Sequence, residues 1–257
     1  MDIDAPDFSL TGRRALVTGA SQGIGAALAV ALAKAGADVA VAGREPDRLG
    51  DTAAAIDAAG RRTHRLELDI RDIARVRGAV GEVVDALGGL DLLVNNAGTE
   101  QVTDSLEVDE DLWDRIVDTN LKGAFFCAQA AARRMAACDG GAILNLGSLA
   151  SGIGIPTAAP YTASKTGVLG MTRALSAEWA PRGVRVNALG PGYFRTRMTE
   201  GFFQDQAWQD AMLGKIPMGR FGRLDDLTGA AVFLASDAAR YLTGQIVYVD
   251  GGYMASI

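Results

Sequence analysis

Short apolar runs alternate along the whole chain with longer helical patterns, and this alternation limits the possible folds more than any other feature. Nearly all of the short runs are apolar on both faces. Strands of that kind occur in parallel sheets that helices cover on each side, because neither face of such a sheet meets water. The candidate strands are RALVT (14–18), DVAVAG (38–43), THRLEL (63–68), LDLLVN (90–95), AILNLG (142–147), VRVNAL (184–189) and QIVYV (245–249).

The segments between these runs, such as IGAALAVALAKAG and IARVRGAVGEVVDALGG, carry apolar residues at helical spacing and end on glycine. They predict the crossover helices of βαβ units. With 257 residues, the chain is expected to form one α/β domain over 1–257. The one long irregular stretch, about 191–223, is rich in Gly, Met and aromatic residues, which predicts a lid over a substrate site.

Charge and residue usage exclude several classes of partner. The chain has 25 Lys and Arg against 31 Asp and Glu, a formal net charge of -6, and no basic run, so we expect no nucleic-acid partner. The N-terminus MDIDAPDFSL is acidic, and no apolar run reaches the roughly 18 residues of a membrane span, which predicts a cytoplasmic protein. Cys127, Cys138 and the single histidine, His64, lack the spacing of a metal site, and no metal is expected.

A glycine-rich turn, TGASQGIG at 18–25, follows the first candidate strand. Its glycines allow positive φ angles and a close approach of backbone to a pyrophosphate, and the helix that follows can direct its amides at the anion. A turn that needs glycine for geometry alone is the alternative, but the position in the first βα turn favours a dinucleotide site. The residues assigned to that site are Gly19, Ser21, Gln22, Gly23, Ile24 and Gly25.

A tyrosine and a lysine stand four residues apart in PYTASKTGVLG. On a helix, Tyr161 and Lys165 share one face, so the ammonium can favour the phenolate and make the tyrosine a general acid/base. An isolated pair of this kind more often reflects a packed ring and a solvated lysine. Ser148, at the end of the strand AILNLG, favours the catalytic interpretation, because its hydroxyl can hydrogen-bond the same substrate oxygen.

These motifs occur in a familiar order. TGASQGIG, NNAG at 95–98, Ser148, the Tyr161–Lys165 pair and PG at 191–192 resemble the short-chain dehydrogenases/reductases over nearly the whole chain. The resemblance implies a single Rossmann-type, doubly wound domain with a seven-stranded parallel sheet of order 3-2-1-4-5-6-7. It also implies hydride transfer between a nicotinamide cofactor and a carbonyl or secondary alcohol, with Ser148 polarising the carbonyl and Tyr161 exchanging the proton.

The resemblance assigns further residues. Asn120 matches an asparagine that disturbs a helix, so that a backbone carbonyl can hold a water in a proton relay ending at Lys165. Asp69 matches the residue that fixes the adenine amino group, and Lys165 matches a lysine that also binds the nicotinamide ribose. The other expected cofactor contacts are Ile70, Asn96, Ala97, Gly98, Tyr161, Pro191, Gly192, Phe194 and Thr196.

The end of the second strand bears on cofactor choice. Gly43 stands where an NAD enzyme needs a carboxylate for the ribose, and Arg44 follows it. Because an arginine can fork onto a phosphate, this pair predicts NADP with Arg44 on the 2′-phosphate. NAD remains the alternative, since Glu45 is adjacent and Gln22 stands where many NADP-binding relatives carry a second base.

Within the family, the chain looks most like the gluconate 5-dehydrogenases and related sugar-acid dehydrogenases, through FSLTGRRALVTGAS, PGYFRTRMTE and GRFGRLDDLTGAAVFLAS. The second segment belongs to the expected lid, where Arg195 and Arg197 either bind a substrate carboxylate or face solvent. The substrate contacts expected are Ser148, Tyr161, Tyr193, Arg195 and Arg197. A reductase of 3-oxoacyl thioesters or other carbonyls is the alternative enzyme, and a non-catalytic dinucleotide sensor or scaffold is the alternative class.

The resemblance also implies a homotetramer whose interface uses the helices around 109–135 and 160–180. The second helix contains TGVLGMTRALSAEWA, which is apolar on more than one face. A helix of this kind can be buried by the sheet on one side and by a partner on another.

Overall fold

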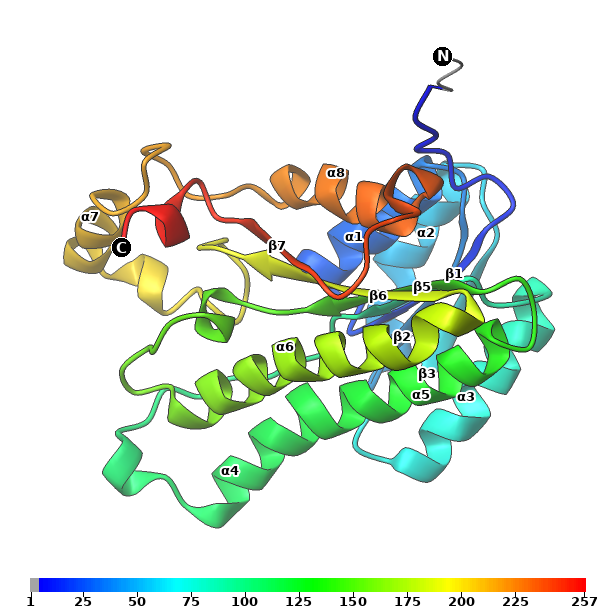
Figure 1. Ribbon diagram of the computed structural model, residues 1–257. Coiled ribbons are helices and arrows are strands. Elements are labelled where there is room, and N and C mark those ends of the chain that lie inside the picture. Colours follow the sequence, from blue (N-terminus) through cyan, green and yellow to red (C-terminus); the bar gives the residue numbers. More distant parts are fainter. Residues whose placement is uncertain (1–4) are drawn as a thin grey trace.

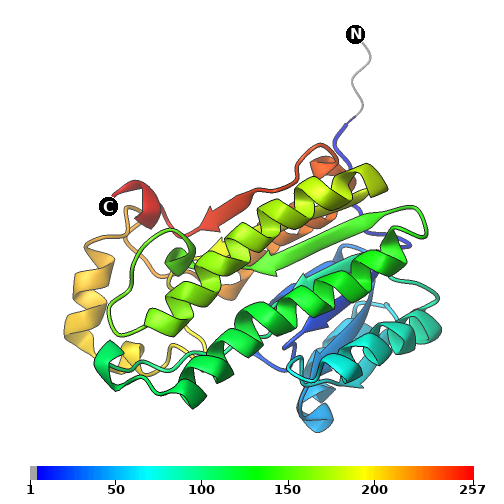
Figure 2. The same cartoon turned by 60° about the horizontal axis from the view of Figure 1, so that its bottom comes forward.

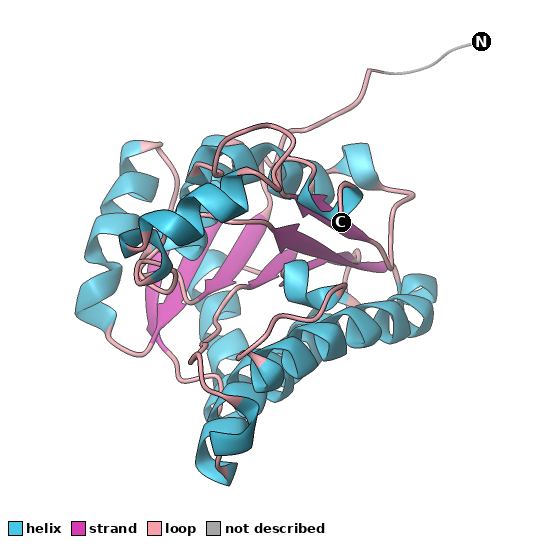
Figure 3. Cartoon of the chain, turned by 90° about the vertical axis from the view of Figure 1, so that its left-hand side faces the viewer, coloured by secondary structure: helices cyan, strands magenta, loops and turns pink. Residues whose placement is uncertain are grey.

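The computed structural model describes residues 5–257 as a twisted parallel sheet between two layers of helices (Figure 1, Figure 3). Its seven strands lie in the order β3-β2-β1-β4-β5-β6-β7, which confirms the predicted topology. The strands are β1 Arg14–Thr18, β2 Asp38–Gly43, β3 Thr63–Glu67, β4 Leu92–Asn95, β5 Gly141–Leu146, β6 Val184–Pro191 and β7 Ile246–Val249. Each differs from its predicted range by two residues or fewer at either end.

Two groups of helices cover the two faces of the sheet. In Figure 1, α1, α2 and α8 lie above it, and α3, α5 and α6 lie below it, with α4 leading into α5. The helices are α1 Gly23–Lys34, α2 Gly50–Ala58, α3 Ile73–Leu87, α4 Glu110–Val117, α5 Ala124–Met135, α6 Ala159–Trp179, α7 Gln206–Leu213 and α8 Leu224–Ala235. No helix among residues 5–257 combines the length and the apolar character that crossing a membrane requires.

The two-sided apolar pattern of the strands has a direct structural counterpart. Successive side chains of a strand point to opposite faces, so β2 contributes Val39 and Val41 to one core and Ala40 and Ala42 to the other. The first core contains the α1 and α8 leucines, and the second contains the apolar faces of α3 and α5. Burial on both faces is what the sequence pattern predicted.

The order of the strands determines where a ligand can bind. The chain runs outward from β1 to β3 and then returns to place β4 on the other side of β1. At such a reversal the loops that follow the two strands separate and leave a crevice at the carboxyl edge of the sheet. The glycine turn follows β1, the NNAG segment follows β4, and Ser148 follows β5 at that same edge.

The expectation that 191–223 is irregular throughout was wrong. This segment contains a short 3-10 turn at Phe202–Gln204 and the helix α7. The Asp205 side chain caps α7 by accepting hydrogen bonds from the amides of Ala207 (2.9 Å) and Trp208 (3.1 Å). The helix is only eight residues long, so its periodicity was too short to detect. In Figure 1 it lies at one end of the sheet, beside the C-terminus.

Candidate active site

The turn between β1 and α1 needs glycine at three positions. Gly19 and Gly23 have φ angles of 65° and 58°, in the left-handed region. A Cβ on Gly19 would lie 2.7 Å from the Cα of Ala97, and a Cβ on Gly25 would overlap the Gly19 carbonyl oxygen. The turn is therefore packed too closely against its surroundings for larger side chains at Gly19 and Gly25.

Asn96 locks this turn to the loop that follows β4. Its side-chain amide donates to the carbonyl oxygens of Thr18 and Gly19, both at 3.0 Å. Gln22 precedes α1 in an extended conformation and caps no amide of the helix with its side chain. The amides of the first turn thus remain available to an anion, and this geometry fits a dinucleotide pyrophosphate.

Two cations lie at the carboxyl end of β2. Arg44 is exposed and close enough to Asp69 to help lower the pKa of that carboxyl. Arg48 donates to Gln22 Oε1 (3.3 Å) and pairs with Glu45 (3.0 Å). Sequence reasoning missed Arg48, although its place four residues after Arg44 could have pointed to it. Its side chain contacts Gln22, the position at which the sequence shows no second base.

The loop after β3 also reaches the crevice. The Asp69 carboxylate pairs with Arg71 at 2.6 Å, and this pairing is the main cause of its lowered pKa. Ile70 is buried, and its carbonyl oxygen lies 2.7 Å from where a Cβ on Gly123 would stand. The loop is therefore packed tightly against the helical turn that contains Asn120.

Asn120 lies in a helical turn that differs from its surroundings. The helix widens into a π-helix over Asp118–Gly123 between α4 and α5, at the place where a disturbance was expected. The buried Asn120 side chain accepts from the Thr99 amide (2.8 Å), donates to the Thr99 carbonyl (2.9 Å) and donates to Ser164 Oγ (3.1 Å). It thereby joins the segment after β4 to α6.

Ser148 and α6 are joined through a second serine. The Ser148 amide donates to Ser151 Oγ (3.2 Å), and Ser151 Oγ donates to the Lys165 carbonyl (2.9 Å). Ser148 Oγ accepts from the Ala150 amide (3.2 Å). The turn after β5 is thus fixed against the helix that carries Tyr161 and Lys165.

Tyr161 and Lys165 lie close together, but the lysine faces the sheet. Lys165 is buried, its Nζ donates to the Leu146 carbonyl (2.7 Å), and the same atom lies 5.6 Å from the centroid of the Tyr161 ring. Burial raises the pKa of Tyr161, the charge of Glu100 raises it further, and the nearby Ser148 hydroxyl opposes both. In the protein without cofactor, the Lys165 ammonium therefore does not bring the pKa of Tyr161 down. Burial also lowers the pKa of Lys165 to about 8.

Comparisons with known proteins agree with this geometry. The family model described as Enoyl-(Acyl carrier protein) reductase matches residues 19–254. The chain belongs to the short-chain dehydrogenase/reductase family. The gluconate 5-dehydrogenase of Gluconobacter oxydans (strain 621H) is 40% identical over 98% of this chain and 99% of its own.

Solved structures give the same result. A candidate short-chain alcohol dehydrogenase from Sinorhizobium meliloti 1021 is 60% identical and has a TM-score of 0.96, covering 98% of this chain and 100% of its own. A gluconate 5-dehydrogenase from Burkholderia cenocepacia J2315, in complex with NADP and tartrate, is 38% identical with a TM-score of 0.94, covering 98% and 99%. This short-chain dehydrogenase/reductase is therefore an oxidoreductase, and its predicted likeness to the gluconate 5-dehydrogenases is confirmed.

The segment after β6 brings the start of 191–223 to the glycine turn of this dehydrogenase. The Gly192 amide donates to the Val249 carbonyl (2.9 Å), which fixes the PG pair beside β7. Thr196 then lies 3.7 Å from where a Cβ on Gly23 would stand. Phe194 is only 3% exposed, because its ring packs in the core. The segment that contains Gly192 and Thr196 therefore runs from the end of β7 to Gly23, and all three residues are expected cofactor contacts.

Aromatic rings pack together along the segment 191–223 and with the C-terminal turn. Tyr193 meets Trp208 and Tyr253 edge to face, with ring centroids 5.3 Å apart in both pairs. Arg195 is exposed and pairs with Glu200 at 2.6 Å, and Arg197 is also exposed. The charged groups expected to bind a substrate carboxylate thus lie on the outside of this aromatic layer.

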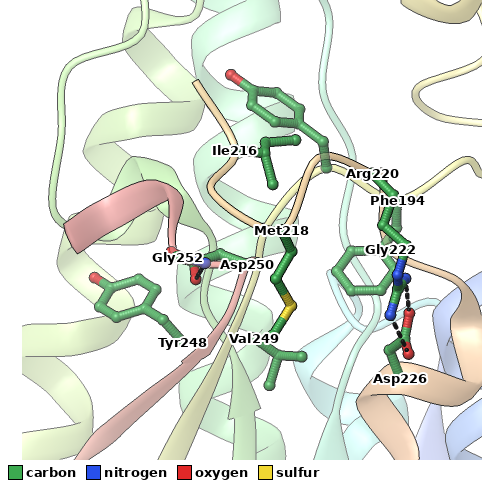
Figure 4. A pocket seen from close by; sticks show the side chains of 12 residues that line it. Phe194, Ile216, Met218, Arg220, Gly222, Asp226, Tyr248, Val249, Asp250 and Gly252 are labelled. Atoms are coloured by element: carbon green, nitrogen blue, oxygen red, sulfur yellow. Dashed lines mark hydrogen bonds and ion pairs between the residues drawn. The ribbon is translucent and has the colours of Figure 1, made fainter. Parts of the chain in front are cut away.

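Figure 4 shows a pocket of about 370 Å³, which is lined by residues of β7, of the turn after it and of the segment 193–226. It shares Tyr193 and Phe194 with the lid, and an ion pair of 2.6 Å between Arg220 and Asp226 closes one side. None of Ser148, Tyr161 and Lys165 lines it. The residues that line this pocket therefore differ from the expected catalytic residues.

Glu100 is a site residue that sequence reasoning missed. It lies two positions after the NNAG segment, and its charge acts on Tyr161, Lys165 and Tyr193. The available signal was an acidic side chain directly after a cofactor-binding loop. Burial raises the pKa of Glu100 itself, and the positive charge of Lys165 opposes that rise.

Proposed function

We propose that this chain is an NADP-dependent dehydrogenase of a polyhydroxy acid of the gluconate and 5-ketogluconate type. Its catalytic residues are Asn120, Ser148, Tyr161 and Lys165. The observation that carries the proposal is that the Ser148 hydroxyl lies near enough to Tyr161 to oppose the rise of its pKa. Hydrogen bonds through Ser151 also hold the turn after β5 against α6. Support for the substrate class comes from the names of the relatives.

In this proposal, bound NADP would supply the hydride chemistry at the reacting carbon. Tyr161 exchanges a proton with the substrate oxygen, and Ser148 donates a hydrogen bond to that oxygen. Burial keeps the tyrosine protonated near neutral pH, so the unliganded site is set to donate a proton in the direction of reduction. Lys165 has to bring its ammonium toward the phenol from its bond to Leu146 if it is to favour the phenolate.

The expected cofactor contacts lie around the glycine turn and the carboxyl end of β2. The glycine turn and the first turn of α1 would hold the pyrophosphate, and Arg44 and Arg48 would bind the 2′-phosphate. Asp69 would meet the adenine, although its carboxylate already pairs with Arg71. The segment 191–223 would form the lid over the substrate, as its aromatic layer suggests.

The test is a panel of polyols, sugar acids and 3-oxoacyl thioesters, assayed by the absorbance of reduced cofactor with NADP and with NAD. We expect the highest kcat/KM for a sugar acid with NADP. A higher kcat/KM for a 3-oxoacyl thioester would contradict the substrate class. The absence of turnover in a protein that still binds NADPH would favour a non-catalytic role.

We also propose that the chain assembles into a homotetramer in the cytoplasm. Figure 2 shows α5 and α6 side by side on the outer face of the sheet. Between them lies a groove of about 530 Å³, whose apolar lining includes Phe125, Ala132 and Leu175. Two copies that pair these helices would cover the groove. Sedimentation at micromolar concentration checks this, and a monomer would contradict it.

A further inference from the structure

Glu100 stands next to a backbone that is fixed against the catalytic residues. Directly before it, Thr99 makes two hydrogen bonds with the Asn120 side chain, at 2.8 and 2.9 Å. Two residues before it, a Cβ on Gly98 would lie 3.8 Å from Lys165 Nζ. The position of Glu100 relative to the catalytic lysine is therefore fixed by the fold.

The chain is fixed again just beyond Glu100. The Thr103 amide donates to the Thr157 carbonyl (2.9 Å), in the loop that leads into α6 and Tyr161. The segment that carries Glu100 thus runs from the π-helical turn to the loop before α6. The backbone on both sides of Glu100 is therefore held by hydrogen bonds.

The carboxylate of Glu100 has no protein partner in the part of the chain that the structure describes. The side chain is half-buried, and no hydrogen bond or ion pair to it occurs within residues 5–257. Its charge nevertheless raises the pKa of Tyr161 on α6 and of Tyr193 in the lid, so it acts on both sides of the substrate space. A half-buried carboxylate without protein partners takes its hydrogen bonds from water, and hydroxyl groups of a ligand can replace that water.

We propose that Glu100 is a specificity-determining residue, which accepts hydrogen bonds from hydroxyl groups beside the reacting carbon and excludes a carboxylate from that place. The proposal rests on the proposed function. It predicts that a sugar acid reacts at a carbon far from its acid group, as the fifth carbon of gluconate is. A 2-hydroxy acid, whose carboxylate adjoins the reacting carbon, would place two like charges side by side.

The experiment compares kcat/KM for gluconate, its neutral analogue glucitol and the 2-hydroxy acid glycerate in the wild type, Glu100→Gln and Glu107→Gln. Glutamine keeps the shape of the side chain and removes its charge. Glu107 is exposed on the same segment and is the matched control. We expect glycerate to be at least 10-fold poorer than gluconate or glucitol in the wild type. We expect Glu100→Gln to raise the kcat/KM of glycerate, relative to that of gluconate or glucitol, at least 10-fold. Glu107→Gln should leave this ratio of kcat/KM values unchanged.

A pH profile separates this role from a merely structural one. Because the charge of Glu100 raises the pKa of Tyr161, Glu100→Gln should shift the rise of alcohol oxidation to lower pH. An unchanged glycerate ratio together with an unchanged profile would overturn the inference. If Glu100→Gln does not fold, the wild type still decides, because turnover of glycerate as fast as gluconate overturns it. Turnover of glucitol without gluconate would refute the sugar-acid proposal and leave the role of Glu100 intact.

Discussion

Replacement of Arg44 by alanine should weaken the binding of NADPH and leave the binding of NADH largely unchanged. Arg44 is exposed and can donate two charge-assisted hydrogen bonds to a 2′-phosphate. A hydrogen bond to a charged group contributes about 1.5–3 kcal/mol, and solvent screening at this exposed position holds the total for the arginine to roughly the same range. Because about 1.4 kcal/mol corresponds to a factor of ten in Kd, NADPH should bind roughly 10- to 100-fold more weakly.

Arg48 should contribute less than Arg44, because it already shares its guanidinium with Glu45 and Gln22. Quenching of protein fluorescence by NADPH and by NADH gives both affinities for each variant. The matched control is Arg13→Ala, since Arg13 pairs with Asp237 away from the crevice. Equal losses for NADPH and NADH, or a wild type that prefers NADH, would refute the reasoning.

Four further results are expected. Tyr161→Phe should lower kcat by about 10²-fold or more while leaving the Kd of NADPH unchanged, and near-normal turnover would show that the tyrosine only packs. The kcat/KM of alcohol oxidation should increase as pH rises through the pKa of Tyr161, because the phenolate is the base, and that of reduction should fall over the same range; stopped initial rates at constant ionic strength measure both. Gly25→Ala should abolish dinucleotide binding, because the new Cβ would overlap the Gly19 carbonyl oxygen, whereas Gly50→Ala, with open space around it, is the control in the same fluorescence titration. Asp91→Ala should destabilise the fold by about 2 kcal/mol in urea, because it breaks a partly buried pair with Arg14 and leaves that guanidinium without its 2.7 Å partner; a loss below about 1 kcal/mol would speak against this.

Sequence reasoning succeeded where the determining interactions are local or repeat along the chain. The strands were predictable because burial on both faces leaves uninterrupted apolar runs such as that of β2. The strand order and the assignment of Asn120 came from the family resemblance, since neither follows from periodicity. The site residues that were missed depend on contacts between distant segments. Arg48 contacts Gln22, 26 residues away in the chain, and the charge of Glu100 acts on Lys165 only once α6 has packed on the sheet.

The hydrogen bonds from Asn96 to the glycine turn also imply an order of steps as the chain is synthesised and folds. The amide reaches back 78 residues to Thr18 and 77 to Gly19, across the boundary between the two halves of the sheet. A nascent chain that ends before β4 therefore contains the glycine turn but lacks the Asn96 hydrogen bonds that fix its shape. Affinity for dinucleotide should arise only once β4 has joined β1, so binding of a fluorescent cofactor can report, in real time, when the two halves of the sheet unite.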